Sequence, residues 1–69
     1  MVSYFIYKNG IKFEEIMTTV DATTEDVFKK WLSDKGFDEV CRNIKQIDET
    51  SFSVEVKDGL VLNIKYEDE

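Results

Sequence analysis

Two Asx-Gly dipeptides, Asn9-Gly10 and Asp58-Gly59, restrict this chain to a fold built around β-hairpins. Each dipeptide separates two runs rich in aromatic and β-branched residues, and Asx-Gly pairs favour the positive φ angles of tight hairpin turns. The first dipeptide predicts strands over residues 2–8 and 11–19. The second predicts strands over residues 51–56 and 60–66.

The apolar alternation of the second hairpin predicts its register. A two-residue loop would set Leu62 opposite Glu55, so a three-residue loop over residues 57–59 is preferred, with Gly59 in the left-handed conformation. Three apolar pairs then share one face: Val56–Leu60, Val54–Leu62 and Phe52–Ile64.

A helix of about three turns is predicted between Thr23 and Gly36. Thr23 and Asp26 have capping-box spacing, and Gly36 follows Lys35 as a left-handed cap. One apolar stripe along the helix must pack on a sheet; it consists of Val27, Phe28, Trp31 and Leu32.

Residues 37–43 are expected to form one irregular or helical turn after the helix. This turn leads into a short strand over residues 44–49, and residues 48–51 reverse the chain. The predicted order is strand, strand, helix, strand, strand, strand, in a single domain over residues 1–69.

Composition excludes several classes of function. The 69 residues include nine Lys and Arg against fifteen Asp and Glu, which gives a net charge of -6, and there is no His. Binding to nucleic-acid phosphates requires clustered cations, so no nucleic-acid partner is expected. Without His, the most common general base and metal ligand is missing. No run reaches the ~18–20 apolar residues of a membrane-spanning helix, so no membrane partner is expected.

The single cysteine, Cys41, cannot form an intrachain disulfide, which favours a reducing, cytoplasmic setting. The apolar run over residues 2–7 is short and lacks preceding basic residues, so no export signal is expected. Because no His can activate the thiol, a small buried apolar role is favoured, with a reactive or regulatory thiol as the alternative.

No set of residues predicts catalysis. Adjacent carboxylates such as Glu14-Glu15 and Asp48-Glu49 point to opposite faces of a strand or lie in solvated turns. The chain has no metal-ligand spacing, no P-loop and no Gly-rich dinucleotide motif. We therefore expect a non-enzymatic protein without metal or cofactor.

The segment VDATTEDVFKKWLSDKG, residues 20–36, follows a hairpin and Met17-Thr18-Thr19 and resembles the helix region of the immunoglobulin-binding domain of protein G. Phe52-Ser53-Val54 resembles the last strand of that family. The resemblance covers roughly residues 4–56. It implies a β-grasp-like fold, in which two hairpins pack against one helix.

The resemblance also implies an antibody-binding surface on the helix and the strand after it. Glu25 and Lys29 match two positions of that surface. Asp26 stands where the family has a lysine, and the strand after the helix lacks the tryptophan of the family. Since a few aromatic or charged residues dominate such interfaces, we expect the fold to be shared and antibody binding to be lost.

A fifth strand must fit into this arrangement. In the four-stranded family the last strand is central, so residues 60–66 are expected beside the first strand and parallel to it. The expected architecture is α+β, with one helix packed on a mixed five-stranded sheet of order 2-1-5-4-3. A separately derived fold with the same elements is the alternative.

The first strand is apolar on both faces, with Tyr4 and Ile6 predicted to face the helix and Phe5 and Tyr7 to face away. The second and third strands are the expected edges of the sheet. Charged residues there discourage unwanted pairing, although a partner strand could add at either edge. These charges are Lys12, Glu14, Lys45 and Glu49.

The leading hypothesis is a small acidic protein-binding domain that uses its open sheet face, through a patch of Phe5, Tyr7, Ile11 and Phe13. Coverage of these side chains by loops, by sheet twist or by long side chains is the alternative. The partner is an unidentified protein or a second copy of the chain bound through the sheet. A second functional hypothesis, based on the net charge, is an inhibitor that mimics the charge of nucleic acid, as small phage proteins do. Immunoglobulin binding is the least favoured functional hypothesis.

Overall fold

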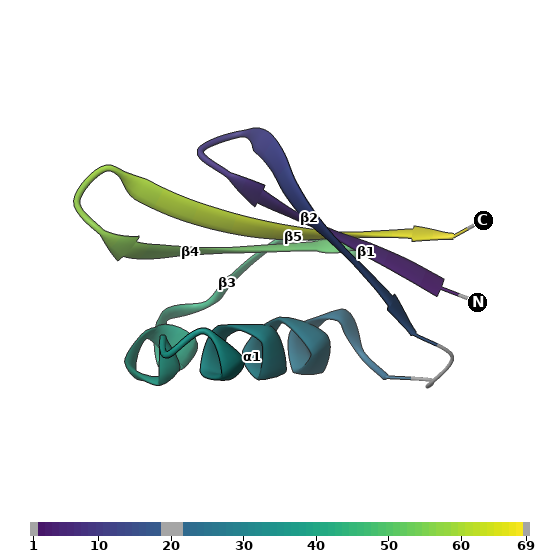
Figure 1. The fold of residues 1–69 in the computed structure, drawn as a ribbon, viewed down its shortest axis with the longest axis horizontal. Helices are drawn as coiled ribbons and strands as arrows, with labels where there is room; N and C mark the ends of the chain where they lie inside the picture. Colours follow the sequence, from purple (N-terminus) through teal and green to yellow (C-terminus); the bar gives the residue numbers. More distant parts are fainter. Residues whose placement is uncertain (1, 19–21, 69) are drawn as a thin grey trace.

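Five strands and one α-helix follow one another in the predicted order in the computed structural model, which describes residues 2–18 and 22–68 (Figure 1). The predicted extension of the second strand to residue 19 lies outside the described residues. The elements are β1 (Val2–Lys8), β2 (Ile11–Thr18), α1 (Thr24–Asp34), a 3-10 helix η1 (Asp38–Asn43), β3 (Lys45–Asp48), β4 (Ser51–Lys57) and β5 (Leu60–Asp68).

The strands form one sheet of order β2-β1-β5-β4-β3, as predicted, and α1 crosses one face of it (Figure 1). All four neighbouring pairs are antiparallel, so the predicted mixed sheet, with β5 parallel to β1, is wrong. Because α1 carries the chain back along the sheet, β3 runs in the direction of β2. The two turns that follow reverse the chain twice, which leaves β5 opposite in direction to β1.

The first hairpin closes with a two-residue turn in which both residues have positive φ angles, 50° at Asn9 and 84° at Gly10. Tyr4 pairs with Ile16 across the hairpin, but the register shifts between Ile6 and Tyr7. Ile6 lies opposite Glu14 and Tyr7 opposite Lys12, so Phe13 is an extra residue in β2. This β-bulge changes which face the following residues of β2 occupy.

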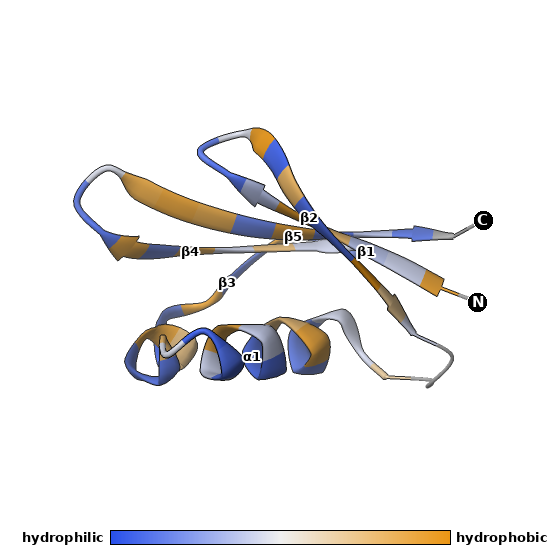
Figure 2. Cartoon of the chain, viewed as in Figure 1, coloured by the Kyte–Doolittle hydropathy of each residue, from blue (hydrophilic) through white to orange (hydrophobic). Residues whose placement is uncertain are grey.

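The second hairpin confirms two predicted pairs, Val54–Leu62 and Phe52–Ile64. The third pair is wrong, because Leu60 lies opposite Lys57 and the register shifts between Glu55 and Lys57. A two-residue turn therefore closes this hairpin, and the extra residue, Val56, restores the apolar pairing that such a turn would otherwise break. Gly59 has the predicted left-handed conformation, with φ 80°. Figure 2 shows hydrophilic colour at the tips of both hairpins.

The α1 helix begins and ends as predicted. The Thr23 side chain accepts a hydrogen bond of 3.1 Å from the Asp26 backbone N–H. At the other end, Gly36 directly follows the C-cap residue Lys35 and has φ 86°. The buried core joins the helix stripe to the central strands. It contains Tyr4, Ile6, Phe28, Trp31, Leu32, Val54, Leu62 and Ile64.

The segment after α1 also matches the prediction, since η1 is a short helical turn that leads into β3. Phe37, Val40 and Cys41 from this segment pack against the core and are half-buried. The segment therefore covers the part of the core at the β4 side of α1. Among the described residues, no helix is long and apolar enough to cross a membrane.

Candidate functional site

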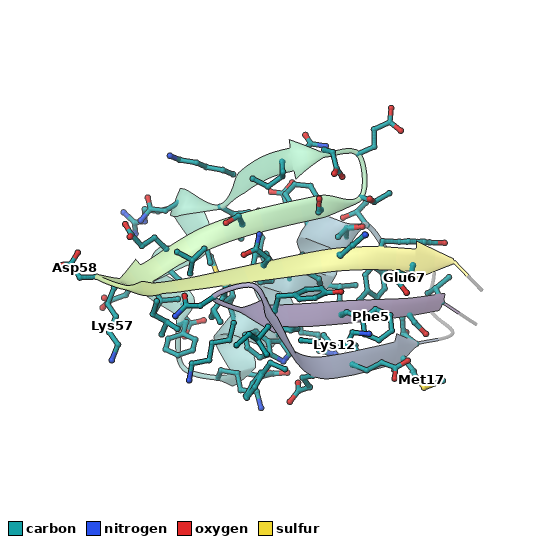
Figure 3. The ribbon with its side chains drawn as sticks, turned by 90° about the horizontal axis from the view of Figure 1, so that it is seen from above. Phe5, Lys12, Met17, Lys57, Asp58 and Glu67 are labelled. Carbon is teal, nitrogen blue, oxygen red and sulfur yellow. The ribbon has the colours of Figure 1, made fainter. Side chains whose placement is uncertain are left out.

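Phe5 and Tyr7 lie on the sheet face opposite α1, as predicted, while Tyr4 and Ile6 are buried beneath the helix. Figure 3 looks onto this open face, with α1 behind the sheet. Phe5 is half-buried, and the Lys12 ammonium lies 4.1 Å from the centre of its ring. This cation–π contact covers part of the aromatic surface that the sequence places in the open.

Polar residues surround Phe5 and Tyr7 on the open face. Phe5 pairs with Glu15 on β2 and with Lys65 on β5, and Tyr7 pairs with Lys12 and Asn63. Neighbouring positions across β5 and β4 are again polar, since Asn63 lies opposite Ser53 and Lys65 opposite Ser51. Phe5 and Tyr7 therefore form a narrow apolar strip along β1 that is bordered by polar residues, and the open face as a whole is not apolar.

Ile11 and Phe13 do not join this open-face patch. Phe13 lines a hollow on the helix side together with Trp31, Lys35 and Phe37. Ile11 pairs with Lys8, which lines the same hollow, so the register places Ile11 on that side as well. The predicted four-residue patch is thus split across the two faces of the β1–β2 hairpin, because the bulge at Phe13 changes the phase of β2.

Large exposed apolar side chains gather on the edge strand β2. Among the described residues, Ile11 is 72% exposed, Phe13 57% and Met17 57%; the fourth such residue, Ile47 on β3, is 61% exposed. Figure 3 shows Met17 at the outer margin of the sheet. Sequence reasoning missed Met17, although its position one residue after Ile16 already places it on the opposite face of the strand.

One carboxylate joins β2 to α1. Trp31 Nε1 donates a hydrogen bond to Glu14 Oε2, and Lys35 Nζ lies 3.7 Å from Glu14 Oε1. Trp31 is itself buried, which confirms its expected place in the core. Beside these contacts, a hollow of about 440 Å³ opens between β2 and α1, with Ile16, Val27 and Trp31 in its lining.

The helix surface implied by the family resemblance is occupied by an internal ion pair. Lys29 Nζ lies 2.9 Å from Glu25 Oε2, and both side chains are about half exposed. The hydrogen bond and the charge of Glu25 raise the pKa of Lys29 above its ordinary value. The two residues therefore satisfy one another on the surface of α1, and a role for them in binding stays a prediction.

Within the described part of the chain, no group of three or more acidic, cysteine or histidine side chains could hold a metal ion. Cys41 is half-buried and packs against the core, with its Sγ 3.9 Å from the Phe37 carbonyl oxygen. The sequence favoured a buried apolar role for this thiol; the structure packs it against the core but leaves it partly exposed. The described surface offers apolar side chains, charges and the backbone of an edge strand for contacts.

No family model, curated protein or solved structure matches the chain.

Proposed function

We propose that this chain is a non-enzymatic protein-binding domain whose contact surface is the β1–β2 hairpin, with the edge strand β2 at its centre. The observation that carries the proposal is the concentration of exposed apolar side chains on β2: Ile11, Phe13 and Met17. Ile11 and Phe13 lie on the helix side of this strand and Met17 lies on its open side, so all three border the same sheet edge. Clustered exposed apolar residues mark interaction surfaces. Phe5 and Tyr7 lie on the open face of the same hairpin, on the inner strand next to β2.

The backbone of β2 supports a particular mode of binding. β2 stands at the end of the strand order, so its outer side faces no other strand among the described residues. An extended segment of a partner can add to such an edge, with main-chain hydrogen bonds providing affinity and alternating side chains providing specificity.

The two sides of β2 offer different environments to the side chains of an added strand. On the helix side, the hollow between β2 and α1 is lined by apolar groups of Ile16 and Val27. On the open side, Lys12 and Glu15 present opposite charges three residues apart. A partner strand that directs apolar residues to the helix side and charged residues to the open side matches both sides.

Exchange of exposed apolar residues tests the proposal. Native capture with the purified domain, followed by mass spectrometry, should lose its specific proteins with Phe13→Ser and with Met17→Ser. Ile47→Ser is the matched control, because Ile47 is equally exposed but lies on the opposite edge strand β3. All three variants should unfold within a few degrees of the parent protein, since surface substitutions usually change stability by less than about 0.5 kcal/mol.

If Phe13→Ser and Met17→Ser capture the same proteins as the parent domain, the proposed surface is wrong. Loss of capture with Ile47→Ser alone would move the surface to β3. A specific partner that binds every one of these variants would place the contact outside both edges of the sheet.

A further inference from the structure

The bulge gives β2 an unusual order of faces. Glu14 contacts Trp31 and Lys35, and Phe13 lines a hollow with the same two residues, so these consecutive side chains both lie on the helix side. On the open side, Lys12 covers the Phe5 ring and Glu15 lies opposite Phe5.

The order in which residues 11–16 occupy the two faces of the sheet is therefore palindromic, that is, the same from either end of the segment. Ile11 and Ile16 lie on the helix side at the two ends, followed inward by Lys12 and Glu15 on the open side, with Phe13 and Glu14 on the helix side at the centre. A regular strand of even alternation cannot have this symmetry about a point between two residues, because consecutive side chains point to opposite faces. The extra residue in β2 creates it.

This symmetry matches what an antiparallel strand requires of a second copy of itself. Residues opposite one another must share a face of the extended sheet. A two-fold axis between Phe13 and Glu14 meets that requirement over all six residues. An axis through Glu14 breaks this requirement, because it sets Phe13, on the helix side, opposite Glu15, on the open side. An axis through Ile16 preserves the faces only over residues 14–18 and brings no opposite charges together.

The same register pairs unlike charges on the open face and the outer apolar residues on the helix side. Lys12 of each copy lies opposite Glu15 of the other, which makes two pairs of opposite charge on the open face. Directly opposed unlike charges stabilise an antiparallel pair, whereas like charges destabilise it. On the helix side, Ile11 of each copy lies opposite Ile16 of the other, which covers one of the most exposed apolar side chains.

We propose that the partner at the β2 edge is a second copy of this chain, joined in the register that sets Lys12 opposite Glu15. The result is a symmetric dimer with a continuous ten-stranded antiparallel sheet and both helices on the same face. The charges on β2 then select one register, since an axis through Glu15 would set two Glu15 carboxylates opposite one another. This inference rests on the proposed function and names its partner.

Charge reversal tests the register. Sedimentation velocity of the parent protein at ~10 μM to ~1 mM should show a concentration-dependent species of twice the monomer mass, as mass action requires of a reversible dimer. Lys12→Glu and Glu15→Lys should each weaken association at least tenfold, because each variant opposes like charges at two positions. An equimolar mixture of these variants, and the double variant, should both recover the dimer, since opposite charges again meet.

Lys45→Glu is the control, because it reverses an exposed charge on the other edge strand and should leave the association constant unchanged. Thermal unfolding of each variant separates weakened association from unfolding.

A parent protein that stays monomeric up to ~1 mM would overturn the inference, as would a mixture of the two single variants that fails to associate. If the protein is monomeric but Phe13→Ser still abolishes capture, the proposed function stands and only the identity of the partner fails. If the protein is monomeric and β2 variants change no capture, both proposals fail.

Discussion

The Asn9 side chain ties the two hairpins together, and its removal should have a measurable cost. Asn9 Nδ2 donates to the Gly59 carbonyl at 2.9 Å, and Asn9 Oδ1 accepts from the Val61 N–H at 2.8 Å. The Asn9 backbone N–H also donates to the Val61 carbonyl, at 2.9 Å. One turn residue of the first hairpin is thus bonded at three points to the tip of the second.

Two substitutions separate the side chain from the backbone of Asn9. Asn9→Gly removes the two side-chain hydrogen bonds and keeps the positive φ angle of 50° accessible. Each exposed bond contributes about 0.5 kcal/mol, so the loss should be about 1 kcal/mol. Asn9→Ala adds the cost of the left-handed conformation, about 1 kcal/mol more. The melting temperature should fall by about 4–8 °C with Gly and by about twice that with Ala.

Thermal and urea unfolding followed by circular dichroism would measure both free energies. Asn9→Asp is the matched control, because it retains the acceptor for the Val61 N–H and tolerates positive φ, while a carboxylate oxygen replaces the donor to the Gly59 carbonyl. The expected order of stability is parent, then Asp, then Gly, then Ala. Equal losses for Gly and Ala would refute the role of the backbone conformation. A loss below about 0.3 kcal/mol with Gly would refute the proposed link between the hairpins.

Three further changes probe other parts of the fold. Thr23→Ala should lower the free energy of unfolding by about 1 kcal/mol, because the Asp26 N–H loses its acceptor, while Thr23→Ser should lose far less in the same urea titration. Ser3→Ala should raise the free energy of unfolding by about 0.5–1 kcal/mol, since the Ser3 hydroxyl is buried without a hydrogen-bond partner in the described part of the chain. A lower free energy of unfolding for Ser3→Ala would contradict this reasoning, because it would mean that the hydroxyl is hydrogen-bonded. Hydrogen bonds from the Thr50 backbone N–H and the Ser51 and Thr50 hydroxyls lower the pKa of Asp48, so its carboxylate stabilises the fold above its ordinary pKa of about 3.8. That contribution is lost as the pH falls through the lowered value, so the difference in melting temperature between parent and Asp48→Asn at pH 7 should shrink as the pH falls below 3.8.

Local signals predicted most of the fold. The Asx-Gly turns and the helix caps locate β1, β2, β4, β5 and the helix, and the chain reversal at residues 48–51 locates β3, because turn geometry and capping depend on residues close together in the sequence. The strand order was also predictable. The direction of β5 was not, because the family resemblance offered a parallel neighbour for β1 and local signals carry no information on the direction of distant strands.

The candidate site was predicted in part. Phe5 and Tyr7 follow simple alternation from the buried Tyr4 and Ile6, so their face was predictable. The faces of Ile11 and Phe13 depend on a bulge that strict alternation ignores. The sequence does hold a sign of it, since Phe13 and Ile16 are three residues apart and can share a face of one strand only if an extra residue lies between them.

The strand order also determines when this sheet can form. β1 and β5 are neighbours at its centre, although they are the first and last strands along the chain, and Val2 lies opposite Asp68. Contacts between such distant segments slow folding, because the long loop must close before they form. During synthesis, the β1–β2 hairpin and the β3–β4 hairpin both leave the ribosome without the strand that separates them. The sheet is therefore completed after translation of β5, and a chain that ends before Leu60 lacks every β5 pair that joins the β1–β2 hairpin to the β3–β4 hairpin.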